Sequence, residues 1–119
     1  MLVCDIDRQR LEKLAAKLCE QRNKGLPIEH GKASYQIIDS GVVFSKAFFK
    51  LDSNKADYST PVAKVELDPL AKSWNLYIYK REEVSLRKIW QSHPVLSHHR
   101  DFAKLIAAIE DDSEDCIWY

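Results

Sequence analysis

The feature of this sequence that most constrains its fold is a series of strand-like segments separated by short polar stretches, between residues 34 and 91. Segments rich in β-branched and aromatic residues recur at 34–38, 42–51, 61–67, 74–80 and 85–91. The stretches between them are shorter than the dozen or more residues that a parallel crossover needs. The sequence therefore predicts an antiparallel meander of four to five strands.

The polar stretches have the residue types of turns and loops. Residues 39–41 (DSG) are predicted to form a three-residue hairpin loop, with Gly41 at the position where a positive φ costs least. The stretch 52–60 is predicted to be a loop because it is polar throughout, and 81–83 (REE) is predicted to join the last two strands. Residues 61–67 alternate between polar and apolar, which indicates a strand with one solvated face.

A helix is predicted on each side of the meander. Residues 6–23 carry an apolar stripe with helical spacing, and Asp5 or Asp7 is suited to cap its start. Ser97 is the predicted N-cap of the second helix, whose stripe is Phe102, Leu105, Ile106 and Ile109. Because each helix needs only one apolar surface, we expect both helices to cover one face of the sheet, in a single α+β domain over residues 1–119.

Charge and cysteine content limit the classes of partner. Lys plus Arg and Asp plus Glu number 18 each, so no net charge attracts the chain to nucleic acid or to an anionic membrane. The longest apolar run, 105–109, is too short to span a bilayer, and no secretion signal is visible. Three widely spaced cysteines without a Cys-x-x-Cys pair fit reduced thiols, so we expect a cytoplasmic protein that does not associate with membranes.

Several short motifs follow one another in a fixed order along almost the whole chain. They are LCEQR at 18–22, TPVAK at 60–64, DP at 68–69 with WNLY at 74–77, Trp90 with HP at 93–94, Phe102 and Leu105 with IEDD at 109–112, and CIW at 116–118. In this order the chain resembles a bacterial family catalogued as the domain of unknown function numbered three thousand and twenty-four. The resemblance implies the helix–meander–helix order and a bacterial source, and it implies no activity. The chain departs from the family in the segment LYIYK at 76–80 and in ending with Trp118 and Tyr119.

A candidate binding surface lies on the strand 74–80 and the one after it. Tyr77 and Tyr79 point to the sheet face opposite Trp74, so they lie on the open face if both helices cover the other one. Together with Arg87 and Trp90 they form the candidate site. Rings interleaved with cations on an open sheet are typical of single-stranded nucleic-acid binding, which is one alternative. The other is an apolar patch, extended by Phe44 and Phe48, that forms a homodimer or binds a protein partner.

A metal site is the competing hypothesis. His93, His98 and Asp101 lie within nine residues, and a turn at Pro94 could bring their side chains together around a divalent ion. Such a site would suit a metal-dependent hydrolase or nuclease. The alternative is that these residues surround the start of a helix, with Asp101 favoured by the helix dipole.

Other catalytic chemistry has little support. The chain has only three glycines and no phosphate-binding glycine loop or nucleophile elbow, so we expect no cofactor and a non-enzymatic binding or self-association module. The acidic run 110–115 is expected to be a solvated turn. The apolar end, with Ile117 and Trp118, is expected to pack against the core.

Overall fold

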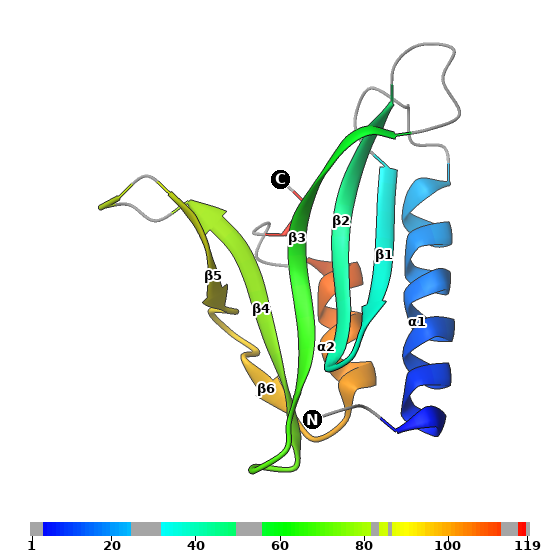
Figure 1. Cartoon of the computed structure of the whole chain (residues 1–119), viewed down its shortest axis with the longest axis vertical. Helices are drawn as coiled ribbons and strands as arrows, with labels where there is room; N and C mark the ends of the chain where they lie inside the picture. The colour runs from blue at the N-terminus through cyan, green and yellow to red at the C-terminus, as the bar shows by residue number, and fades with distance from the viewer. Residues whose placement is uncertain are drawn as a thin grey trace.

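The computed structural model describes residues 4–24, 32–49, 56–81, 84–85, 87–112 and 117–118. Within these residues the chain forms two helices and six strands (Figure 1). In chain order they are α1 (Asp5–Asn23), β1 (Lys32–Ile38), β2 (Gly41–Phe49), β3 (Ala56–Asp68), β4 (Ser73–Arg81), β5 (Lys88–Ser92), β6 (His98–His99) and α2 (Phe102–Asp111).

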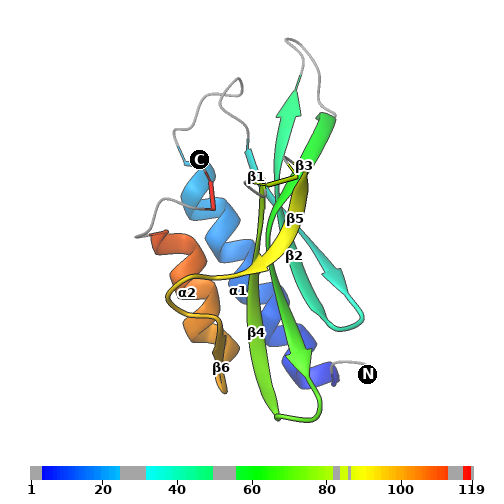
Figure 2. The same cartoon turned by 90° about the vertical axis from the view of Figure 1, so that its left-hand side faces the viewer.

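All strand pairs are antiparallel, and the sheet order β1-β2-β3-β4-β5 follows the chain. The short strand β6 pairs with β4 beside the end of β5. Figures 1 and 2 show both helices on one side of the sheet, which confirms the predicted α+β arrangement. None of the helices that the structure describes is both long and apolar enough to cross a membrane.

The core lies between the sheet and the two helices. Alternation along the strands sends every second side chain to this side, and the apolar stripes of α1 and α2 meet them. The residues at its centre, all with 0% exposure, are Leu11, Ala15, Val42, Phe44, Ala63, Val65, Leu76, Leu105 and Ile109. Trp74 and Phe102 extend the core towards the start of α2, with ring centroids 5.0 Å apart.

The end of α1 is fixed to the edge strand β1 by one side chain. The Asn23 amide donates from Nδ2 to the Ala33 carbonyl at 2.8 Å, and its Oδ1 accepts from the Ala33 N–H at 2.6 Å. The Asn23 side chain therefore occupies backbone groups that would otherwise be open at this edge of the sheet.

The turn between β1 and β2 is tighter than predicted. Ile38 pairs directly with Gly41, so Asp39 and Ser40 alone form the turn, and Gly41 is the first residue of β2. The requirement for glycine has a different origin, because a Cβ on Gly41 would lie 1.8 Å from the Val65 carbonyl oxygen of β3. Close approach of two strands, and not a positive φ, demands glycine here.

The starts of β3 and β5 differ most from the predictions. β3 starts at Ala56, within the polar stretch that was predicted to be a loop, because residues 56–60 pair with the end of β2. This pairing satisfies backbone groups whatever the polarity of the side chains. β5 starts at Lys88 instead of residue 85, and Val84 and Ser85 lie in a turn.

The segment between β5 and α2 also differs from the prediction. The chain leaves the sheet after Ser92 and returns as β6. The Leu76 carbonyl accepts from the His93 N–H at 3.0 Å, and the Leu76 N–H donates to the Ser97 carbonyl at 2.8 Å. Ser97 therefore belongs to the sheet edge and is not a helix cap. The N-cap of α2 is Asp101, whose Oδ1 accepts from the Ala103 N–H at 3.0 Å.

Candidate functional site

Three of the four predicted binding residues lie together on the open face of the sheet. Tyr79 of β4 is directly opposite Trp90 of β5, and their ring centroids are 5.0 Å apart with an interplanar angle of 51°. Tyr77 lies two residues from Tyr79 on the same face, and all three side chains are half-buried. Arg87 is exposed just before β5 and takes part in none of the ring contacts found among the described residues.

A lysine outside the predicted binding set completes this group. Lys64 of β3 is opposite Tyr77, and its ammonium nitrogen lies 5.3 Å from the Tyr77 ring centroid and 4.4 Å from that of Trp90. Both distances suit a cation–π contact. We call Lys64, Tyr77, Tyr79 and Trp90 the aromatic cluster.

The charge of Lys64 is balanced within the sheet. Its Nζ lies 3.3 Å from Oε1 of Glu66, and the Ser40 hydroxyl donates to Oε2 of Glu66 at 2.8 Å. The cation therefore has a carboxylate partner and also covers a ring face of Trp90. A nucleic-acid base could stack on that face only by displacing Lys64, so this arrangement does not favour the nucleic-acid alternative.

The apolar patch expected on the open face is smaller than the sequence suggests. Phe44 points to the helix side and is fully buried in the core, so it cannot contribute. The Phe48 side chain lies outside the described part of the structure. The exposed large apolar side chains lie elsewhere, and they are Ile6, Leu70, Val84, Ile89 and Val95 among the described residues.

His93 is buried and organises the turn that follows β5. Its exposed fraction is 6%, and its Nδ1 accepts from the N–H groups of Val95 at 3.2 Å and Leu96 at 3.0 Å. A ring nitrogen that accepts two backbone hydrogen bonds carries no proton. This nitrogen therefore holds the excursion between β5 and β6 in place.

The other predicted metal ligands also have structural partners. His98 Nδ1 lies 3.2 Å from the Ser97 hydroxyl, and Asp101 caps α2. The neighbouring His99, which is not one of the predicted ligands, accepts from the Asp101 N–H through its Nδ1 at 2.8 Å. Among the described residues, no group of three or more His, Cys, Asp or Glu side chains is placed to hold a metal ion. The metal site of His93, His98 and Asp101 stays a prediction, and the geometry supplies each of these residues with another role.

The described part of the C-terminal end packs against the core, as expected. Ile117 and Trp118 are 4% and 2% exposed, and the Trp118 indole donates to the Ile109 carbonyl at 2.9 Å. The Arg22 guanidinium stacks over the Trp118 ring at 4.4 Å. Burial lowers the pKa of Lys46, the positive charges of Arg22 and Lys88 lower it further, and the Asp112 carboxylate opposes this shift.

Asp112 corrects the expectation that the acidic run is a solvated turn. It is 4% exposed and left-handed, with φ 43°, at the end of α2. Its carboxylate accepts from the N–H groups of Ile117 at 3.2 Å and Trp118 at 3.1 Å. Glu110 and Asp111 are exposed, whereas residues 113–116 lie outside the described residues.

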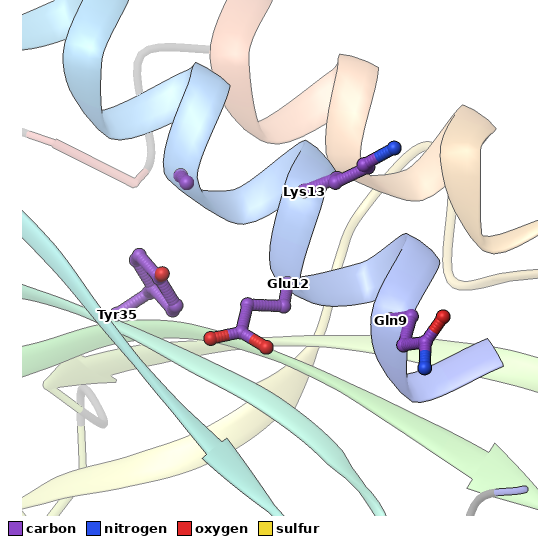
Figure 3. A pocket seen from close by; sticks show the side chains of 5 residues that line it. Gln9, Glu12, Lys13 and Tyr35 are labelled. Carbon is purple, nitrogen blue, oxygen red and sulfur yellow. The ribbon is translucent and has the colours of Figure 1, made fainter. Parts of the chain in front are cut away.

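A shallow depression of about 450 Å³ lies between α1 and β1 and is lined by Gln9, Glu12, Lys13, Ala16 and Tyr35. Figure 3 shows the Glu12 carboxylate on the sheet side of α1, facing the same space as the Tyr35 ring, while Lys13 points away from the sheet. In most ligand sites a few polar groups converge on one point, and the polar groups of this depression do not.

The two described cysteines lie in different surroundings. Cys19 is buried in the core, and this burial raises the pKa of its thiol to about 11. Cys4 is exposed at the start of α1. A thiol with a raised pKa is a poor nucleophile at neutral pH, so the structure gives Cys19 a packing role.

Comparison with known proteins gives one family. Neither a search of the curated proteins nor a search of the solved structures found a match to the chain. A family model described as "Domain of unknown function (DUF3024)" matches residues 3–119, which is essentially the whole chain. The chain therefore belongs to the DUF3024 family.

Proposed function

We propose that this protein is a non-enzymatic bacterial self-association module that acts in the cytoplasm and forms a homodimer through β4 and β5. The observation that carries the proposal is the position of the exposed apolar side chains. Ile89 is part of β5, Val84 lies just before it and Val95 just after it, with exposed fractions of 36%, 91% and 69%. Exposed apolar side chains that follow one edge of the sheet favour an interface along that edge.

The aromatic cluster lies on the open face of the same strand pair, whereas Ile89 points to the other face of β5. Trp90 lies between Ile89 and Gln91 on β5, and it is braced by Tyr79 and Lys64. Tryptophan and tyrosine are enriched among the residues that dominate interface energies, because they bury a large area at little cost in side-chain entropy. Trp90 would be the central contact residue, and Arg87 would lie at the polar rim.

The proposal is tested by the mass of the protein in solution. Sedimentation equilibrium and light scattering should give twice the chain mass of 13.8 kDa at high concentration, with dissociation on dilution. Replacing Val95 by Asp should weaken the dimer at least tenfold, because the charge would lose its hydration in an apolar interface. Leu70→Asp is the matched control, since Leu70 is also exposed but lies in the β3–β4 turn.

Three results of these measurements would count against the homodimer. A monomer at every concentration tested would overturn it, and so would a dimer that Val95→Asp and Leu70→Asp weaken equally. Binding of single-stranded oligonucleotides by the monomer, lost at higher salt and in Tyr77→Ala, would favour the nucleic-acid alternative.

A further inference from the structure

The two edge strands of the sheet, β1 and β5, differ in how their outward backbone groups are covered. At the β1 edge, the Asn23 side chain occupies the outward N–H and C=O of Ala33. At the other edge, β5 is the last strand of the sheet, and Figure 1 shows it at the outer margin, far from α1. Within the described chain, β5 pairs with β4 alone. An uncovered edge strand is a template for another strand.

The pairing between β4 and β5 shows which backbone N–H and C=O groups of β5 point away from β4. The N–H and C=O of Leu76 both face the β5 side, where they bind Ser97 and His93. This orientation alternates along an antiparallel strand, so Ile78 and Lys80 also face β5 and bind their partners Gln91 and Ile89. The outward N–H and C=O groups of β5 are then those of Lys88, Trp90 and Ser92.

From this geometry we infer that β5 pairs with β5 of a second copy, antiparallel and about a twofold axis at Trp90, so that the two sheets become one. The inference rests on the proposed self-association and specifies its register. Lys88 lies opposite Ser92 of the second copy, Ile89 opposite Gln91, and Trp90 opposite Trp90. Each outward residue then exchanges its hydrogen bonds with an outward residue of the other strand.

The side chains are compatible with this register. Arg87 and Lys88 lie at one end of β5, so antiparallel pairing holds the cations of the two copies apart. Trp90 of each copy falls on the open face beside the other, which joins the two aromatic clusters across the axis. The pairing also places the start of β5, which follows Val84, beside the end of β5 of the second copy, which precedes Val95. Val84 and Val95 are both exposed.

Proline at position 88 tests the outward hydrogen bonds. Lys88→Pro removes an outward N–H but no bond to β4, and proline is tolerated at such edge positions. We expect this variant to keep the secondary structure and melting behaviour of the monomer and to raise the dissociation constant of the dimer at least tenfold. Lys88→Ala is the matched control, because it removes the same side chain but keeps the N–H, and it should dimerise normally.

Mixed cysteine variants test the register. Opposed residues of an exchanging pair have Cα atoms about 5.5 Å apart, within the range for a disulfide. In a background with Cys4→Ser and Cys116→Ser, oxidation of Lys88→Cys mixed with Ser92→Cys should give a cross-linked dimer. Each variant alone should cross-link much less, because position 88 does not face 88 and position 92 does not face 92.

The outcomes separate this inference from the proposal on which it rests. A wild-type monomer would overturn both. A dimer that tolerates Lys88→Pro, or one in which Ser92→Cys alone cross-links as well as the mixture, would overturn the edge pairing and leave self-association by another geometry.

Discussion

Single residues in this fold have roles that depend on neighbours distant in the sequence. Asp112 belongs to an acidic run that reads as a solvated turn, yet it is buried and accepts the N–H groups of Ile117 and Trp118. Lys64 alternates with apolar residues like any lysine on a wet strand face, yet it packs on Trp90 of β5. In each case a polar group is used to fix another part of the chain.

Replacing Asp112 by Ala should lower the free energy of unfolding by about 2–4 kcal/mol, because it leaves two backbone N–H groups buried without their acceptor. The left-handed backbone at this position adds to the cost for alanine. Denaturant unfolding measures the change. Asp111→Ala is the control and should alter the stability by less than about 0.5 kcal/mol, since Asp111 is exposed. Equal effects of the two variants would contradict this role of Asp112.

At the scale of elements, the sheet edge beyond β4 is built from two short strands with an excursion between them. β5 and β6 each pair with part of β4, and the chain between them turns away from the sheet at His93. The Nδ1 atom of His93 accepts the N–H groups of Val95 and Leu96, in a stretch that does not pair with β4. The excursion therefore needs an acceptor at this position.

His93→Ala should destabilise the protein by about 1–3 kcal/mol, since two N–H groups lose their acceptor. Amide hydrogen exchange should show the loss at Val95 and Leu96 first. His93→Asn offers a side-chain oxygen and should recover part of the stability, while His98→Ala should be nearly neutral because His98 is exposed. A chelator should leave the melting temperature of the wild type unchanged. A fall in melting temperature on chelation would instead support the predicted metal site.

At the scale of the whole molecule, one core joins both ends of the chain. α1 and α2 pack on the same face of the sheet (Figure 2), and Ile117 and Trp118 belong to the same core. Arg22, near the end of α1, stacks on Trp118 and so links the first helix to the last described residues. Ile117 and Trp118 are thus part of the hydrophobic core.

A truncation after Asp115 should lower the free energy of unfolding by about 3–5 kcal/mol, because it removes a buried tryptophan and its neighbour. Trp118→Ala should account for most of this loss. Denaturant unfolding followed by circular dichroism gives both values independently of the lost fluorophore. An unchanged transition midpoint for the truncated chain would contradict the packing of this end in the core.

Most elements of this fold could be predicted from the sequence, because their signals are local. Apolar spacing identifies α1 and α2, short connections impose the antiparallel meander, and alternation assigns Tyr77 and Tyr79 to one face. Errors arose where pairing overrides composition, as at residues 56–60, and at β6, whose two residues have too short a pattern to detect.

The sequence by itself determined which residues face the same side of each strand, and hence most of the candidate site. Only the tertiary structure decided the register in which neighbouring strands pair, the pairing of β6 with β4, and the contacts beyond α2. The register brings Lys64 onto Trp90 and Val65 against Gly41. The packing beyond α2 brings the Asp112 carboxylate to the backbone N–H of Trp118. The physical reason is that periodicity is a property of one segment, whereas contacts between segments depend on the packing of the whole core.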